Sequence, residues 1–198
     1  MAAERRQPGG DRRRAILDAA ITVIARSGVR GFRVEQVAEE AQVAVSLLYY
    51  YFRNRNGLVQ AALEHANERA EAVVHGGESG RQAVERTLLA ELDGSSRDTS
   101  AVWGEVLASA VFEPELRDGL RAAAEAWTGL VAAAVEAGRS DGSISADVDA
   151  RASAERLIAL VEGLSSRWLA EITTREQAQR LLTEAIALEL PAQRPAAG

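Results

Sequence analysis

Cysteine and lysine are both absent from this 198-residue chain. Without cysteine the chain can form neither a disulfide nor a thiolate metal site, and a reducing compartment is permitted. No apolar run approaches the roughly 18 residues that a membrane-spanning helix needs. The first residues, MAAERRQPGGDRRR, also lack the apolar core of a secretory signal. These absences predict a cytoplasmic protein with no membrane partner, no metal and no cofactor.

Aromatic residues make up only 5% of the chain, and there are only four prolines. Aliphatic residues are abundant, and they recur at the three- and four-residue spacing of a helix rather than at the alternating spacing of a strand. The length suits one sizeable domain or two small ones. The chain is therefore predicted to be all-α, with about nine helices.

The charge is divided unevenly along the chain. Residues 1 to 60 hold ten arginines against six acids, a net charge of +4, whereas residues 61 to 198 hold thirteen arginines against twenty-three acids, a net charge of −10. A basic end suits a polyanion such as DNA, while an acidic remainder would repel DNA and favour one docking orientation.

The basic end contains a stretch, residues 34 to 63, that is typical of a DNA reader. Its first short helix has apolar residues at positions i, i+3, i+4 and i+7, namely Val34, Val37, Ala38 and Ala41. That helix ends near Gln42, a second short helix lies between Val43 and Leu48, and a longer one includes Leu58. Two short helices separated by a few residues indicate a helix-turn-helix, whose second helix enters a major groove.

Tyrosines and arginines follow in one short run, LLYYYFRNRNGL. Their hydroxyls and guanidinium groups suit phosphate oxygens. The run resembles the end of the DNA-binding domain of the TetR family, in which Leu-Tyr-Tyr-X-Phe closes the recognition helix and a polar turn opens the fourth helix. The resemblance covers residues 12 to 63 by motif, and the later helices by their pattern alone.

The resemblance implies four segments: a disordered basic arm (1–11), a three-helix DNA-binding domain (12–56), a helical ligand-binding and dimerisation domain (57–190) and a disordered tail (191–198). It also implies a homodimeric repressor that leaves a palindromic operator in double-stranded DNA when a small-molecule effector binds. The predicted base contacts are Val45, Ser46, Leu47 and Tyr49, with Ala44 and Leu47 suited to thymine methyl groups. The predicted phosphate contacts are Arg33, Tyr50, Arg53 and Arg55. Tyr51 is either a further contact or a packing residue.

Three positions depart from the family pattern. Arg33 and Ala44 stand where a hydroxyl residue usually caps the second helix and the recognition helix, and Gln42 stands where the turn usually has glycine. The side chains of Arg33 and Ala44 cannot accept hydrogen bonds from the unpaired amides at the start of a helix, and a left-handed backbone at Gln42 costs free energy that glycine would not lose. Ser46 is an alternative cap, which would move the start of the recognition helix by two residues.

Other signals delimit the remaining helices. Gly28 is the expected stop of the first helix, and Pro191 ends the last one. The predicted caps are Asp11, Asn54, Ser79 with Gln82, either Asp147 or Asp149, and Thr173 with Glu176. His65 and His75 are interpreted as surface residues rather than metal ligands, because neither has carboxylates at ligand spacing.

An effector site is expected among the helices that follow residue 80. Trp103, Phe112, Trp127 and Trp168 are its candidate lining residues, with Glu105 and Glu162 as polar anchors for a cationic or hydroxylated ligand. The alternative for each tryptophan is ordinary core packing, and for each acid a solvated surface position.

The last two helices carry more apolar surface than one stripe, which predicts a second subunit. In the family that this chain resembles, these helices pair with their copies in a four-helix bundle. The predicted interface residues are Leu160, Gly163, Arg167, Leu182 and Ile186, with Leu190 also facing away from the main stripe. Gly163 would permit close helix approach, or is merely tolerated there.

Two other functions remain open. A helical dimer controlled by a protein partner would need no small-molecule pocket. An enzyme with an unfamiliar helical site would need clustered carboxylates in a deep cavity. The sequence contains no glycine-rich phosphate loop, no Ser-His-Asp set and no carboxylate-histidine metal spacing, so we predict a regulator and not an enzyme.

Overall fold

The computed structural model describes residues 8–71 and 77–193, with the side chains of residues 8, 9 and 68–71 left aside. The described residues form helices joined by turns, as predicted. They divide into two compact units. The reader unit contains the described residues up to Ala66 together with Ala101–Leu120, and the body unit contains Asn67–Ser100 and the described residues from Arg121 onward. The sequence placed a single boundary after residue 56, whereas the structure also assigns a later segment to the reader unit.

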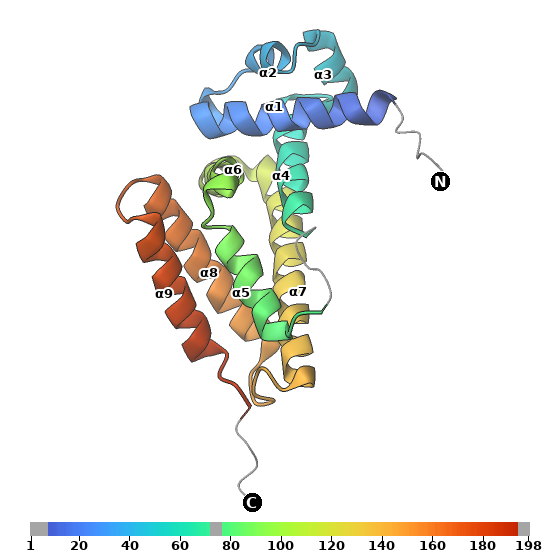
Figure 1. Cartoon of the computed structure of the whole chain (residues 1–198). Coiled ribbons are helices and arrows are strands. Elements are labelled where there is room, and N and C mark those ends of the chain that lie inside the picture. Colours follow the sequence, from blue (N-terminus) through green and yellow to red (C-terminus); the bar gives the residue numbers. More distant parts are fainter. Residues whose placement is uncertain (1–7, 72–76, 194–198) are drawn as a thin grey trace, which may run out of the picture. The chain divides into compact units, whose positions relative to one another are not determined.

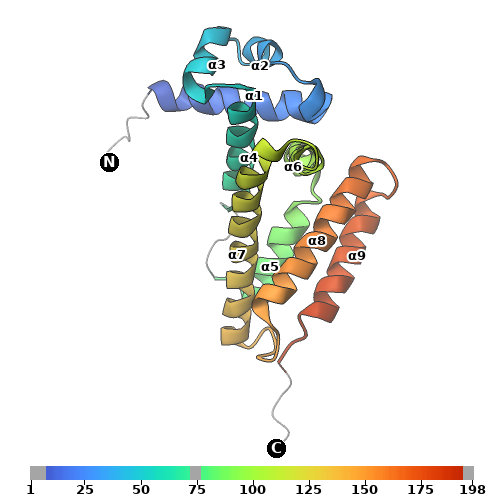
Figure 2. The same ribbon diagram turned by 180° about the vertical axis from the view of Figure 1, so that it is seen from behind.

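The reader unit is built on α1 (Pro8–Gly31), with α2 (Val34–Glu40) and α3 (Val45–Phe52) on the same side of it, as Figures 1 and 2 show from opposite directions. It also holds the first part of α4 (Arg55–Glu71), most of α6 (Arg97–Ala110), the 3-10 turn η2 (Pro114–Leu116) and the start of α7 (Arg117–Asp141). Its largest fully buried side chains include Ile16, Leu17, Ile24, Leu48, Leu58 and Leu63.

α1 starts earlier than expected. It begins at Pro8, so part of the predicted disordered arm is helical, and Asp11 lies in the first turn instead of capping it. Proline is well suited to a first turn because its missing N–H would have no helical acceptor there. The predicted stop at Gly28 is confirmed, since the φ of 70° and ψ of 162° at this residue break the helical geometry. Arg5 and Arg6 lie outside the described residues.

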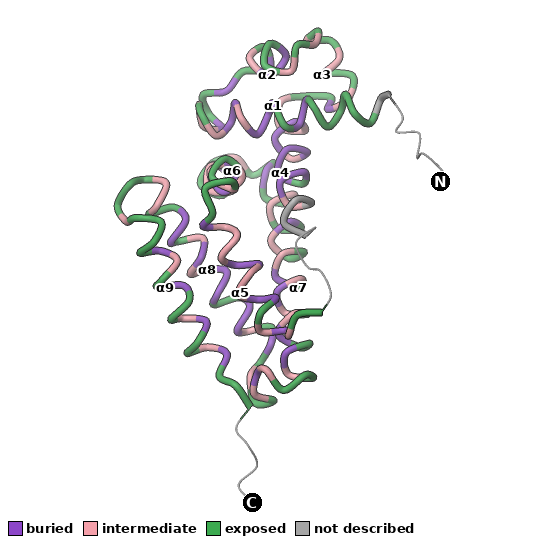
Figure 3. Tube along the Cα trace, viewed as in Figure 1, coloured by how far each residue is buried: buried purple, intermediate pink, exposed green. Residues whose placement is uncertain are grey.

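The body unit contains α5 (Gly80–Ala90), the 3-10 turn η1 (Gly94–Ser96), the rest of α7, α8 (Ala150–Leu169) and α9 (Arg175–Glu189). α8 packs along α9, and α5 contacts both of them. Figure 3 shows buried and exposed positions alternating along these helices. The core formed between them is almost entirely aliphatic and includes Val84, Leu88, Leu92, Val131, Val135, Ile144, Leu157, Val161, Leu182 and Ile186.

The helices of the body unit begin at well-formed caps. Ser79 accepts from the amide of Gln82, whose side chain accepts from the amide of Ser79 in return at 3.0 Å, so the predicted capping box is confirmed. Asp149, one of two predicted candidates, accepts from the amide of Ala152 at 2.9 Å. α9 is capped by Thr174 and not by Thr173. Each cap satisfies an amide that has no partner inside its helix.

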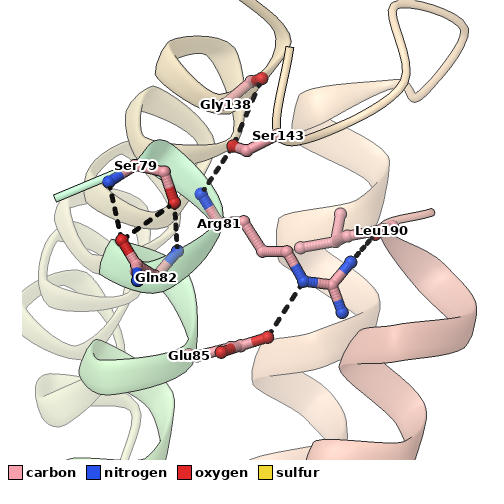
Figure 4. A network of polar contacts seen from close by, with 7 residues as sticks. All are labelled: Ser79, Arg81, Gln82, Glu85, Gly138, Ser143 and Leu190. Atoms are coloured by element: carbon pink, nitrogen blue, oxygen red, sulfur yellow. Dashed lines mark hydrogen bonds and ion pairs between the residues drawn. The ribbon is translucent and has the colours of Figure 1, made fainter. Parts of the chain in front are cut away.

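A polar network ties the start of α5 to the end of α7 and the end of α9 (Figure 4). The amide of Arg81 donates to Ser143 Oγ at 3.2 Å, and its guanidinium donates to Glu85 at 3.0 Å and to the carbonyl oxygen of Leu190. Glycine is required beneath this network, because a Cβ at Gly80 would lie 2.0 Å from the backbone nitrogen of Gly138.

The predicted loose tail is held at its start. The Pro191 carbonyl accepts from the amide of Ser145 at 2.7 Å, and the Gln193 side chain accepts from the amide of Ala146 at 2.9 Å. These bonds satisfy two loop amides that precede α8 and join residues 191 and 193 to that loop.

The apolar surface of α9 differs from the prediction. Leu182, Ile186 and Leu190 are fully buried in the body unit's own core, so the first two do not belong to an exposed dimer interface. The buried stripe follows the spacing i, i+4, i+8 from Ala178, and this register turns Leu181 and Leu188 outward, with Leu188 84% exposed. No described helix combines the length and apolarity that crossing a bilayer demands.

Candidate nucleic-acid interface

The turn between α2 and α3 has a defined geometry despite its missing glycine. The amide of Val43 donates to the carbonyl of Ala38 at 2.9 Å, and that of Gln42 to the carbonyl of Glu39 at 3.1 Å. This pair of bonds is the Schellman motif, which requires a left-handed residue after the helix C-cap. Gln42 is that residue, with a φ of 55°, as its place in the motif predicted. The turn therefore has the expected geometry at some cost in backbone strain.

Neither helix of the reader starts with a side-chain cap. Arg33 precedes α2 and has only donors in its side chain, so Gln36 instead accepts from the amide of Arg33 at 2.8 Å. Ala44 precedes α3. Ser46 lies inside the helix, so the alternative that made Ser46 the cap is wrong. The recognition helix thus begins where the family pattern places it, with its first amides left to solvent or a ligand.

α3 buries one side and exposes the other. Leu48 and Phe52 anchor it in the reader unit, while Tyr49 and Tyr50 are 48% and 79% exposed. Ala44 and Ser46 are exposed, and Val45 and Leu47 are half-buried. Tyr51 is also half-buried, with its ring edge-on to that of Tyr50 at 5.3 Å, which favours the packing role. A surface rich in aromatic hydroxyls on a short helix can contact base edges and phosphates.

The arginines near α3 fall into two groups. Arg33 and Arg53 are exposed, as phosphate contacts need to be, and so are Arg12, Arg13 and Arg14 at the start of α1. Arg55 is different. Its guanidinium donates to the carbonyl of Val29, lies 4.5 Å from the ring centroid of Phe32 and pairs with Glu113 at 4.0 Å. The structure therefore gives Arg55 partners within the protein, unlike the exposed Arg33 and Arg53, although its side chain remains 33% exposed.

Three residues predicted for the effector site belong to the reader unit, and two of them contact the end of α1. Glu105 accepts from the amide of Val29 at 3.0 Å, and a Cβ at Gly28 would lie 2.7 Å from its carboxylate. Phe112 is 70% exposed and lies under the guanidinium of Arg30 at 4.8 Å. Both predictions are corrected, because these side chains serve contacts with the end of α1. Trp103, which is half-buried, belongs to the same unit.

His65 is not the surface residue that the sequence indicated. It is buried in the reader unit, and its Nε2 lies 3.0 Å from Asp18 Oδ1, which joins α4 to α1. His75 lies outside the described residues. Among the residues that the structure describes, no group of three metal-ligating side chains comes together.

Family models match both parts of the chain. The model for "Bacterial regulatory proteins, tetR family" covers residues 16–62, which include α2 and α3, and the model for the C-terminal domain of the BetI-type transcriptional repressor covers residues 78–191. The chain belongs to the TetR family. Its helix-turn-helix is accordingly that of a family of DNA-binding transcriptional regulators, and α3 is the recognition helix.

Individual TetR-family relatives support this assignment. A crystal structure of a Rhodococcus sp. protein assigned to the TetR family is 42% identical, with a TM-score of 0.86, and covers 91% of this chain and 99% of that one. A transcriptional regulator from Saccharomonospora viridis, solved in complex with choline, is 26% identical, with a TM-score of 0.76, over 93% and 99%. The transcriptional regulator BetI of Cronobacter sakazakii is 26% identical over 113 residues, 53% of this chain. The chain spans about half the length of the curated relatives it matches.

The remaining predicted effector residues of this TetR-family chain lie in the body unit. Trp127 and Trp168 are half-buried and pack against the aliphatic core, and the guanidinium of Arg97 lies 5.5 Å from the ring of Trp168. A depression of about 400 Å³ at the α8–α9 connection includes Trp168 but neither Trp127 nor Glu162 in its lining. Part of the surface of both tryptophans is therefore buried by core packing, which was the alternative to an effector site.

One carboxyl group of the body unit was not predicted from the sequence. Glu91, at the end of α5, is partly buried and accepts from Ser100 Oγ at 3.4 Å. Burial raises the pKa of the Glu91 carboxyl, the hydrogen bond from Ser100 lowers it, and the nearby charge of Glu162 raises it further. The signal in the sequence was weak, because an acid at a helix C-terminus looks like a solvated residue.

Proposed function

We propose that this chain is a homodimeric repressor that binds a palindromic operator in the bacterial cytoplasm and leaves it when a small cation binds to the body unit. The observation that carries the DNA-binding part is the exposed side of α3 within a TetR-type helix-turn-helix, above all Tyr50. Ala44, Val45, Ser46, Leu47 and Tyr49 would contact bases, and Arg33, Tyr50 and Arg53 would contact phosphates. Two copies of α3 would enter successive major grooves about 34 Å apart.

The outer faces of α8 and α9 are the proposed subunit interface. Leu160, Gly163 and Arg167 of the predicted set lie on α8, and Leu181 and Leu188 replace the buried pair on α9. Apart from its chain neighbours and its own helix backbone, a Cβ added at Gly163 would meet no atom of the described residues within 4 Å, so it leaves room for a second helix. Gly163→Leu should therefore weaken the dimer, which sedimentation over a range of protein concentrations would measure.

Two observations support a cationic effector. The partly buried Glu91 carboxyl accepts from Ser100 Oγ at 3.4 Å, and burial and the charge of Glu162 raise its pKa, so a bound cation would stabilise its charged form. Trp168 already faces one cation, the guanidinium of Arg97, and aromatic faces also bind quaternary ammonium groups. The Saccharomonospora viridis relative contains choline, so choline is the first probe to try.

The test uses a DNA duplex that the full-length protein has selected from random sequences. We expect binding of this duplex, quenching of tryptophan fluorescence by choline chloride and not by potassium chloride, and release of the duplex by choline. A coupling of about 1–3 kcal/mol corresponds to a roughly 5- to 150-fold loss of operator affinity. Glu162→Gln should reduce the response to choline while leaving duplex binding intact.

Failure at different steps has different meanings. No enrichment of any duplex would contradict the operator-binding function itself. Duplex binding that no small cation changes would refute the cationic effector and favour control by a protein partner.

A further inference from the structure

The backbone N–H and C=O of Val29 lie where α1 breaks. The left-handed conformation of Gly28 interrupts the helix, and the chain turns towards α2 through Phe32, whose amide donates to the carbonyl of Gly28 at 3.1 Å. The break leaves the N–H and C=O of Val29 in need of partners, while its side chain is fully buried. An unpaired polar group in such a place would cost about 1–3 kcal/mol.

Two oppositely charged side chains from elsewhere in the reader unit supply these partners. Glu105, on α6, accepts from the Val29 N–H at 3.0 Å, and Arg55, at the start of α4, donates to the Val29 C=O. We call Val29, Arg55, Glu105 and Glu113 the Val29 clamp, because Glu113 also pairs with Arg55. Hydrogen bonds to charged groups are among the stronger ones in proteins.

Arg55 is held on three sides within the clamp. The Val29 carbonyl lies at one end of its guanidinium, the face of the Phe32 ring lies 4.5 Å from its central carbon, and the Glu113 carboxylate partly neutralises it at 4.0 Å. Phe32 is buried and stands two residues before the first residue of α2. Fixing this ring and the Val29 carbonyl fixes the path by which the chain enters the helix-turn-helix.

Glu105 and Glu113 lie in the segment of residues 101–120, and this segment makes further contacts with α1 and α4. Gln60 of α4 donates to the carbonyl of Glu115 at 3.1 Å, and Arg30 lies over the ring of Phe112. The clamp is thus the polar part of a continuous contact within the reader unit. It joins the α1–α2 junction to a segment that lies more than 70 residues later in the chain.

We propose that Arg55 and Glu105 are positioning residues of the DNA reader, which set the orientation of α2 and α3 through the Val29 backbone without touching DNA. The proposal rests on the proposed operator binding, because operator affinity is one of its readouts. It assigns Arg55 a role that differs from that of the exposed Arg33, although both arginines flank the same helix-turn-helix.

The salt dependence of operator binding separates the two roles. Each phosphate contact removed should reduce the slope of log K against log salt concentration by about 0.9. We expect Arg55→Ala to lower affinity for the selected duplex about ten- to a hundredfold with an unchanged slope. Arg33→Ala, the matched control, should reduce the slope by about 0.9 without changing the thermal stability.

Arg55→Lys is the sharper variant, because it keeps the charge but loses the planar fork. A phosphate contact would survive this change, whereas an ammonium group cannot serve the Val29 carbonyl, Phe32 and Glu113 together. We expect Arg55→Lys to weaken operator binding nearly as much as Arg55→Ala. Wild-type affinity of Arg55→Lys, combined with a reduced slope for Arg55→Ala, would overturn the proposal.

Glu105 tests the clamp from its other side. Glu105→Ala should weaken operator binding and speed hydrogen exchange of the Val29 amide, while Glu105→Gln, which keeps an acceptor oxygen, should restore both. The losses from Arg55→Ala and Glu105→Ala should combine to less than their product, because both side chains hold the backbone of one residue, Val29. Independent, fully multiplicative losses or an unchanged Val29 exchange rate in Glu105→Ala would contradict the shared clamp.

The experiment also separates this proposal from the proposed function. A wild-type protein that selects no duplex refutes operator binding, and the exchange rate of Val29 still tests the clamp in the intact chain. A wild-type protein that binds normally, with Arg55 variants that behave as phosphate-contact variants, refutes the positioning role alone.

Discussion

The reader and body units solve the same problem, the orphan backbone groups at helix ends, in different ways. In the body unit, Ser79, Asp149 and Thr174 each accept a hydrogen bond from an amide of the helix that they start. In the reader unit, neither α2 nor α3 has a side-chain cap, and the broken end of α1 is held by Glu105 and Arg55, which are distant in sequence. Local caps make a helix end independent of its surroundings, whereas α2, α3 and the broken end of α1 depend on tertiary contacts. In the reader unit α4 has a local cap, because Asn54 accepts from the amide of Gly57 at 2.8 Å.

The difference has a physical consequence for DNA binding. A helix of eight residues without a cap has little stability of its own, because helix nucleation is costly and few turns offset it. α3 is such a helix, and it is kept in place by Leu48 and Phe52. Its uncapped amides are also available to DNA phosphates, which interact favourably with a helix N-terminus.

The largest loss of stability is expected from a substitution in the aliphatic core of the body unit. Leu182→Ala removes a fully buried side chain from α9 and should lower the free energy of unfolding by about 2–5 kcal/mol. Leu188→Ala, on the same helix but 84% exposed, should leave the core intact and cost less, because it removes only contacts of the proposed subunit interface. Urea unfolding at fixed protein concentration measures both. Equal losses for the two variants would contradict the register of α9.

Removing a cap in the body unit and adding one in the reader unit should change the stability of the protein in opposite directions. Asp149→Ala removes the cap of α8 and should cost about 1 kcal/mol, while Ala44→Ser gives α3 the cap that it lacks and should add a similar amount. Thermal unfolding of both variants tests the pair. Because the added hydroxyl would compete for the first amides of α3, we also expect Ala44→Ser to bind the operator less tightly.

Glu91 provides a pH test confined to the body unit. Burial raises the pKa of its carboxyl above the ordinary value of 4.5, so the folded protein binds this proton more tightly than the unfolded chain. Glu91 therefore lowers stability progressively as the pH rises from 4.5 through the raised pKa. Glu91→Gln should unfold at a higher temperature than wild type at pH 7, with a difference that shrinks towards pH 4. A constant difference across this range would exclude the titration of Glu91 as its cause.

The smallest effect is expected in the turn of the reader. Gln42→Gly relieves a left-handed conformation that costs about 1–2 kcal/mol, but adds roughly 0.5–1 kcal/mol of backbone entropy to be lost on folding. The net gain should lie between about 0 and 1.5 kcal/mol, visible as a small rise in melting temperature. Gln42→Val should lower it, since β-branched residues fit this conformation poorly. A rise for valine would show that the turn is not left-handed at this position.

Local patterns predicted the helices and most of their ends. The caps at Asn54, Ser79 and Asp149 and the breaks at Gly28 and Gln42 depend on residues only a few positions apart, so the sequence contains the whole signal. The error on α9 had a different origin. Its apolar residues are dense enough to support two registers, and only the position of the body core decides that Ile186 is inside and Leu188 outside.

The sequence pattern predicted which residues of α3 are exposed, but it did not predict the long-range pairings of charged side chains. Tyr49 and Tyr50 follow from the motif alone. Arg55 looked like a phosphate contact, and Glu105 like an effector anchor, because nothing near them in the sequence reveals that both bind the Val29 backbone. A charged side chain can pair with many groups, and the tertiary fold determines which of them lie within reach.

Because residues 101–120 belong to the reader unit, this unit cannot be isolated or transferred as one continuous fragment. The chain passes between the units within α4, α6 and α7, so a fragment that ends at residue 66 omits Glu105 and Glu113. A chimera that grafts only the first 66 residues onto a related regulator would place the Val29 amide against a foreign side chain. A functional graft would need to transplant the two separate stretches of the reader unit together.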